Sequence, residues 1–294
     1  MEAYWLGVLL AIFSGVSHYT GLLIEKSIIN KIPPDVKLMK NLVRTPLWLF
    51  ALFLRFGVGT IFFMIAQVLI GPVLVPGLIA SGLVILVLGS TKIIGEKLNT
   101  LEIIAIAMII FAITLIGLSE LSIEISEINL LNLEFIIRMA IYTCALVFLA
   151  IVFQILQKNY GNIRSILFAL ISGLMFSLSS FWISPLMAVI THIFSGTFNL
   201  GELILFIVSS FMLVLTNIFA VTKMVEALHH GQASNLVPIQ NVPQQITPAI
   251  VYFLIFFKIP PSIFSIIFFM IASILILISS FILGKRQAHI EEIK

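Results

Sequence analysis

Charged side chains are scarce in this sequence: they make up 10% of its 294 residues, whereas 61% are hydrophobic. A soluble domain of this composition would have too little polar surface to face water, so soluble folds are excluded. Cysteine is scarcer still, and the single Cys144 excludes an internal disulfide. The sequence therefore predicts an all-α integral membrane protein, whose helices bury apolar surface against one another and against lipid.

Apolar stretches of membrane-spanning length recur along the whole chain. Windows of about 20 apolar residues predict nine transmembrane helices, near residues 4–24, 46–69, 71–92, 101–118, 135–157, 164–190, 202–223, 233–257 and 261–283. The connections between them are too short to fold alone, so we expect residues 1–294 to form a single transmembrane domain. A cleaved signal peptide is not expected, because Glu2 stands where a basic segment should precede the first span.

Lysine and arginine fall almost entirely on one side of the predicted membrane. When the nine spans are threaded back and forth, thirteen basic residues lie on the side of the C-terminal tail, and only Arg138 and Lys258 lie on the other side. The positive-inside rule then places the N-terminus outside and the C-terminus in the cytoplasm of a multi-pass protein of the cell (plasma) membrane. These cations are expected to contact anionic lipid headgroups of the bilayer, and no nucleic acid partner is expected.

One segment has the length of a membrane span but is polar in its first half: QASNLVPIQNVPQQITPAIVYFLIFFK, from Gln232 to Lys258. Its prolines at 238, 243 and 248 remove backbone donors, which predicts a discontinuous helix between Pro238 and Pro248. Four amide side chains lie among these prolines: Gln240, Asn241, Gln244 and Gln245. Because amides cannot face lipid without a partner, we expect them to line a cavity; the alternative is that they only join neighbouring helices.

The two halves of the sequence resemble each other. LVP occurs at 74–76 and again at 236–238, and each copy is followed by an apolar span, a short charged turn and a further apolar span. With the third span running inward and the eighth outward, this predicts an inverted-topology repeat: repeat 1 at about 1–118, a linker and fifth helix at about 119–160, repeat 2 at about 161–284 and a cytoplasmic tail at 285–294. Solutes bind near the midplane between such repeats. The alternative is a chance similarity between apolar helices.

The span that ends in GEKLN, at 95–99, and its counterpart in the second half resemble the drug/metabolite transporter superfamily, which includes EamA-like permeases. The resemblance implies a secondary transporter without an ATP site. The nearest branch is that of the NIPA-type magnesium transporters, which is similar at TPLWLF (45–50), ILQKNYG (155–161) and the segment 217–238. Asn217 fits a polar position of this branch. Thr60 and Phe63, however, stand where the branch has a glutamate and an asparagine.

Polar side chains of four predicted helices fall in one layer of the membrane. At about 1.5 Å per helical residue, Arg55 lies roughly 14 Å, and His18, Asn217 and Gln240 roughly 9–10 Å, above the cytoplasmic ends of their spans. We therefore expect a solute to bind between helices 1, 2, 7 and 8, through His18, Arg55, Asn217, Gln240, Asn241 and Gln244. Further candidates to line this site are the serines of the sixth span: Ser177, Ser179, Ser180 and Ser184.

None of the thirteen carboxylates is predicted near the membrane centre, which leaves Arg55 as the only charge at that depth. This favours an anionic or neutral hydrogen-bonding solute. It also predicts that Arg55→Lys and Arg55→Ala abolish uptake without affecting folding. The alternative is a magnesium or other divalent-cation transporter, in which Glu25 or Glu226 would bind the cation at the cytoplasmic edge.

Two other classes of protein compete with a transporter. The cluster Glu226, His229 and His230 has spacing that could hold a metal, but neither a third His or Cys ligand nor an HExxH or nucleophile-elbow motif accompanies it. We therefore expect no enzyme activity, no resident metal and no cofactor. A non-transporting structural or lipid-binding membrane protein is the second alternative. The sequence leaves open whether the chain forms a homodimer.

Overall fold

The computed structural model describes residues 2–32, 38–70, 74–79, 82–95, 98–119, 130–260 and 262–293, and within these ranges all regular secondary structure is helical. Six of the described helical segments are long and apolar enough to cross a membrane: Tyr4–Ile29, Pro46–Ile70, Leu133–Asn159, Arg164–Ser195, Leu200–His230 and Ile263–Leu283. Two shorter apolar helices cover Leu83–Ile94 and Thr100–Ile116. The chain thus has the all-α build of a multi-pass membrane protein.

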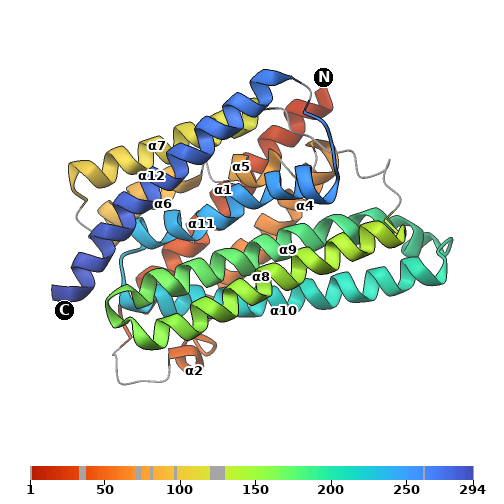
Figure 1. The fold of residues 1–294 in the computed structure, drawn as a ribbon. Helices are drawn as coiled ribbons and strands as arrows, with labels where there is room; N and C mark the ends of the chain where they lie inside the picture. Colours follow the sequence, from red (N-terminus) through yellow and green to blue (C-terminus); the bar gives the residue numbers. More distant parts are fainter. Residues whose placement is uncertain are drawn as a thin grey trace.

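The described chain is a succession of helical elements (Figure 1). In chain order they are α1 (Glu2–Ile29), α2 (Leu38–Leu42), α3 (Pro46–Leu52), the π-helical η1 (Phe53–Val58), α4 (Gly59–Ile70), α5 (Leu74–Ile79), α6 (Leu83–Gly89), the π-helical η3 (Ser90–Ile94), α7 (Thr100–Leu118), α8 (Leu133–Asn159), the short 3₁₀-helix η5 (Gly161–Ile163), α9 (Arg164–Ser195), α10 (Leu200–His230), α11 (Ala233–Ile250), the π-helical η6 (Val251–Ile255) and α12 (Ile263–Ile293).

Each of the nine predicted apolar segments is helical over most of its described residues, although the third falls on two short helices, α5 and α6. Most of the predicted linker at 119–134, together with Glu96 and Lys97 of the GEKLN stretch, lies outside the described residues. The apolar windows locate helices well because a long apolar segment has no other way to satisfy its backbone in lipid.

Local sequence sets several helix ends. Asn99 accepts a hydrogen bond from the Glu102 amide at 2.8 Å while the Glu102 carboxylate accepts one from the Asn99 amide at 2.7 Å, which is a capping box at the start of α7. Asn199 and Glu202 form the same box at the start of α10. Gly196 ends α9 with φ of 75°, a left-handed conformation that glycine adopts without strain.

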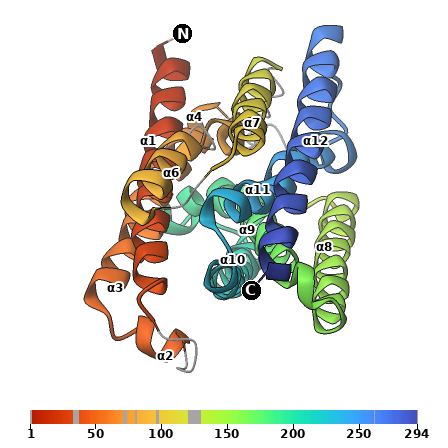
Figure 2. The same ribbon diagram turned by 90° about the vertical axis from the view of Figure 1, so that its left-hand side faces the viewer.

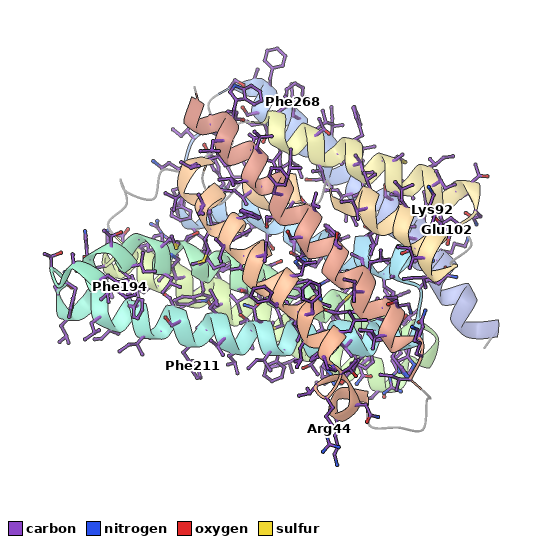
Figure 3. All side chains as sticks on the ribbon, turned by 180° about the vertical axis from the view of Figure 1, so that it is seen from behind. Arg44, Lys92, Glu102, Phe194, Phe211 and Phe268 are labelled. Carbon is purple, nitrogen blue, oxygen red and sulfur yellow. The ribbon has the colours of Figure 1, made fainter. Side chains whose placement is uncertain are left out.

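The helix α9 lies at the centre of the bundle. In the span Arg164–Ser195, 83% of the most apolar window is buried, against 22% in α8 and α10. It packs along α8, α10 and α11, while α1 packs along η1 and α4 and α7 packs along α12 (Figure 2). Phe194 and Phe211 point outward from the bundle (Figure 3) and are 80% and 63% exposed, as expected of a surface that faces lipid.

The helix α11 corrects the prediction of a discontinuous helix. It runs without interruption from Ala233 to Ile250, through all three proline positions, and the irregular backbone follows it as the π-helical η6. The prediction treated the segment in isolation, where each proline removes a donor and crowds the preceding turn. In the bundle α11 packs closely against α9, and neighbouring helices commonly satisfy the backbone groups that proline frees.

Candidate functional site

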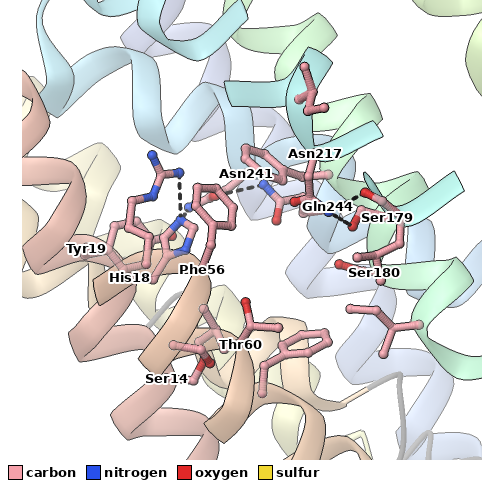
Figure 4. A pocket seen from close by; sticks show the side chains of 18 of the residues that line it. Ser14, His18, Tyr19, Phe56, Thr60, Ser179, Ser180, Asn217, Asn241 and Gln244 are labelled. Carbon is pink, nitrogen blue, oxygen red and sulfur yellow. Dashed lines mark hydrogen bonds between the residues drawn. The ribbon is translucent and has the colours of Figure 1, made fainter. Parts of the chain in front are cut away.

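A cavity of about 360 Å³ lies among α1, η1, α4, α5, α9, α10 and α11 (Figure 4). Five of the six predicted solute-binding residues line it: His18, Arg55, Asn217, Asn241 and Gln244. Also in its wall are Ser14, Tyr19, Phe56, Gly59, Thr60, Phe63, Ile79, Phe176, Ser179, Ser180, Ile183, Leu213, Val214, Ile218 and Gln245. The lining combines amides, hydroxyls and aromatic rings, and among the described residues its one cationic side chain is Arg55.

The guanidinium of Arg55 forms a buried ion pair with Glu25. Its Nη1 donates to both carboxylate oxygens, at 3.0 Å to Oε1 and 2.9 Å to Oε2, and neither side chain is accessible to solvent. This corrects the expectation that no carboxylate lies near Arg55. The predicted first span ended at residue 24, but α1 continues to Ile29, so Glu25 lies within the helix. Estimating depth from each span alone also ignored that a long arginine side chain reaches well beyond its own Cα.

His18 contacts the other side of the same guanidinium. Arg55 Nη2 lies 3.3 Å from His18 Nε2. Because a guanidinium can only donate hydrogen bonds, Nε2 must accept, which assigns His18 as a neutral imidazole with its proton on Nδ1. The Phe56 and Phe176 rings stack on each other at 6.0 Å, and the centroid of Phe56 lies 4.9 Å from Arg55 Cζ. A carboxylate, an imidazole and two aromatic rings therefore surround this cation.

Amide and hydroxyl groups form the other polar part of the cavity wall. Asn241 Nδ2 donates to the Tyr19 hydroxyl, which joins α11 to α1, and Gln244 Nε2 lies 3.4 Å from Asn241 Oδ1. Asn217 Nδ2 donates to Ser179 Oγ at 2.6 Å, which joins α10 to α9. Figure 4 shows these groups around the cavity from several helices. They offer a solute neutral hydrogen-bond donors and acceptors.

Gln240 is placed differently from the other predicted site residues. It is 1% exposed and does not line the cavity; its Nε2 donates to Ser172 Oγ at 3.1 Å, and Ser172 donates to the Ala220 carbonyl at 2.8 Å. These bonds join α9, α10 and α11. For this amide the structure therefore favours a role in holding helices together, whereas Asn241 and Gln244, on the same helix, reach the cavity.

The two carboxylates of the cation hypothesis lie in different surroundings. Glu25 contacts Arg55, and Glu226 accepts a hydrogen bond from Lys223 at 2.8 Å. Within the described residues, no three His, Cys, Asp or Glu side chains gather in a group that could hold a metal ion. His229 and His230 are neighbours with ring centroids 5.2 Å apart, and the ring of His230 stacks on Phe168.

Sequence reasoning missed the aromatic part of the cavity, which comprises Tyr19, Phe56, Phe63 and Phe176. Phenylalanine occurs 25 times in the chain, so its presence in a span carries no signal of a site. Of the four candidate serines, Ser179 and Ser180 line the cavity. Ser177 instead donates to the Gly173 carbonyl in its own helix, and Ser184 accepts a hydrogen bond from Gln67 at 3.2 Å.

Comparisons of the chain with models of protein families, with curated proteins and with solved structures gave no match. The cavity and its surroundings are therefore the evidence on which a function can be proposed.

Proposed function

We propose that this protein is a secondary transporter, or permease, that carries a small hydrogen-bonding solute across the cell membrane by alternating access. The observation that carries the proposal is the cavity of about 360 Å³, whose polar lining comes from helices that are otherwise apolar. Polar groups within membrane helices are costly and commonly mark solute pathways. A volume of this size is typical of small-molecule sites.

Two π-helical turns support the proposal of an inverted repeat with nine spans, as in the drug/metabolite transporter superfamily. The turn at Ser90–Ile94 begins sixteen residues after Leu74 of the first LVP, and the turn at Val251–Ile255 begins fifteen residues after Leu236 of the second. Because π-helical turns are rare, their recurrence at the same place in both halves is stronger support than the shared tripeptide.

Two glycine contacts support the same repeat. A Cβ added at Gly15 would lie 2.2 Å from the Ile79 carbonyl oxygen, and one added at Gly173 would lie 2.1 Å from the Gln240 carbonyl oxygen. Ile79 and Gln240 follow their LVP leucines by five and four residues. The first proposed repeat therefore brings α1 against α5 in the way that the second brings α9 against α11.

The charges around the cavity favour a neutral or anionic solute over a divalent cation. Among the residues that the structure describes, no carboxylate lines the cavity, and Glu25 is already paired with Arg55. A dehydrated divalent cation needs several oxygen ligands, commonly carboxylates, to replace its water. Nothing in the cavity favours the alternative of a structural or lipid-binding protein, for which a polar cavity would have no use.

A ligand screen by thermal shift tests the proposed transport site. A solute present at 100 times its Kd should raise the stability of the detergent-purified protein by about 2.7 kcal/mol. Thr60→Trp, which fills the cavity, should remove this stabilisation, whereas Thr114→Trp on the exposed face of α7 should keep it. The screen should contain small metabolites of both charges and divalent cations. Equal stabilisation of the two variants, or stabilisation by magnesium alone, would contradict the proposed site.

The proposed orientation predicts which loops can be labelled from outside. In a Cys144→Ser background, a cysteine at Glu127 should react with a membrane-impermeant maleimide on intact cells, because the connector after the fourth span is proposed to be extracellular. Cysteines at Asp35 and His289 should react only after the cells are opened. Labelling of the cysteine at Asp35 on intact cells would overturn the proposed topology.

A further inference from the structure

The contacts of Arg55 with Glu25 and His18 leave the site electrically balanced. Glu25 compensates the charge of Arg55. His18 Nε2 accepts a hydrogen bond from Arg55 Nη2, and the two nitrogens are 3.3 Å apart. Both residues line the cavity, but Arg55 is 1% exposed whereas His18 is only partly buried. A proton or a solute entering the cavity therefore has access to the imidazole more readily than to the buried guanidinium.

A proton on His18 would change the chemistry of this contact. Once Nε2 takes up a proton from water, it becomes a donor, and the imidazolium faces a guanidinium that also only donates. Two cationic donors at this separation repel each other unless an acceptor lies between them. A carboxylate offers acceptor oxygens without a donor, so it can accept from Nε2 and Nη2 together in charge-assisted hydrogen bonds.

Building on the proposed transport function, we propose that the cavity binds a small carboxylate anion together with one proton, and that His18 carries this proton. The anion and the proton favour each other. Without the proton, the negative charge of an anion would be uncompensated, because Glu25 already balances Arg55. Without the anion, the imidazolium would lie beside the guanidinium with no acceptor between them. Bound together, the anion and the proton leave the net charge of the site unchanged. This avoids adding an uncompensated charge to a site within the membrane.

Within the described part of the chain, no other group beside His18 offers the same function. The titratable and charged groups described there are Tyr19 on its own helix and Arg55 from η1, with Glu25 reached through Arg55. The elements across the cavity, α9, α10 and α11, contribute only neutral side chains to its lining, among them Phe176, Asn217 and Asn241. The rings of Phe56 and Phe176 beside His18 provide a surface for the apolar body of a carboxylate.

Calorimetry with benzoate as the probe tests this proposal. Binding to the purified protein at pH 7 is measured in two buffers that differ in heat of ionisation, because the difference reports the protons taken up. We expect about one proton per bound benzoate. Benzamide, which is neutral, should bind without proton uptake. Benzamidine, a cation of similar size, should bind at least tenfold more weakly than benzoate.

The matched variant is His18→Gln, whose amide oxygen can still accept from Arg55 but cannot take up a proton at neutral pH. It should bind benzoate at least tenfold more weakly and without proton uptake, and its loss of affinity for benzamide should be smaller than its loss for benzoate. Benzoate binding without proton uptake by the unaltered protein would overturn the role of His18, whatever the variant does. Absence of benzoate binding would overturn the carboxylate class. The transport proposal would survive that result if another solute stabilised the protein and Thr60→Trp removed the effect.

Discussion

Glu25→Gln is expected to lower the free energy of unfolding by about 3–5 kcal/mol, the usual cost of removing one partner of a buried ion pair. Arg55 would be left with its charge, because a guanidinium does not lose its proton at physiological pH. Both side chains are inaccessible to solvent, so the variant would keep a buried charge that no carboxylate compensates. The measurement is reversible unfolding of the purified protein in detergent at pH 7.

Removal of the other partner of the ion pair, by Arg55→Ala, should destabilise the protein less than Glu25→Gln. The abandoned carboxylate can take up a proton and become neutral, which an arginine cannot do. This result would replace the expectation from the sequence that Arg55 can be removed without affecting folding. Because that expectation assumed no carboxylate beside Arg55, it does not hold for a residue whose Nη1 contacts both Glu25 oxygens.

A double variant and a surface control complete this test. Glu25→Gln combined with Arg55→Gln leaves no buried charge and should recover most of the stability lost in Glu25→Gln. Glu134→Gln breaks an ion pair of the same type, between Glu134 and Arg138 on the surface of α8, and should cost less than about 1 kcal/mol. If Glu25→Gln and Glu134→Gln lowered the free energy of unfolding by the same amount, the buried ion pair would be no more important for stability than the surface pair.

Gly173→Ala is expected to destabilise the protein by about 1–3 kcal/mol, the usual range for overpacking. The added Cβ would lie 2.1 Å from the Gln240 carbonyl oxygen and 3.1 Å from Pro243 Cδ. A backbone carbonyl and a proline ring cannot rotate away as a flexible side chain can, so α9 and α11 would have to separate. The gain of up to about 1 kcal/mol from replacing a helical glycine by alanine does not offset a contact this short.

The same change should weaken solute binding, because it moves the two helices that place Ser179 and Gln244 in the cavity wall. Gly15→Ala should have a similar effect on α1 and α5, where the added Cβ would lie 2.2 Å from the Ile79 carbonyl oxygen. Gly161→Ala is the control, since an added Cβ there meets no atom within 4 Å. Unfolding curves and ligand-induced thermal shifts of the three variants can be compared directly. A Gly173→Ala protein as stable as Gly161→Ala would contradict the close packing of α9 and α11.

Composition and periodicity alone determined the class of protein and the position of its helices. Long apolar segments must form helices in lipid whatever their neighbours are, so the nine predicted segments coincide with helical segments of the described chain. The same reasoning directed attention to His18, Arg55, Asn217, Asn241 and Gln244, because a polar side chain in an apolar span needs a partner wherever it lies. The predicted end of the first span, at residue 24, was the least accurate part of this reasoning. The helix α1 continues to Ile29, and the added turn brings Glu25 into the bundle.

The packing of helices that are distant in the sequence decided which side chains each polar residue contacts. Glu25 and Arg55 are thirty residues apart, and whether they meet depends on how α1 and η1 lie side by side, which neither span reveals. Gln240 and Gln244 belong to one helix and have the same chemistry, yet Ser172 of α9 engages the first while the second reaches the cavity. The unbroken course of α11 likewise depends on α9, because the backbone of Gly173 approaches it more closely than any side chain would allow.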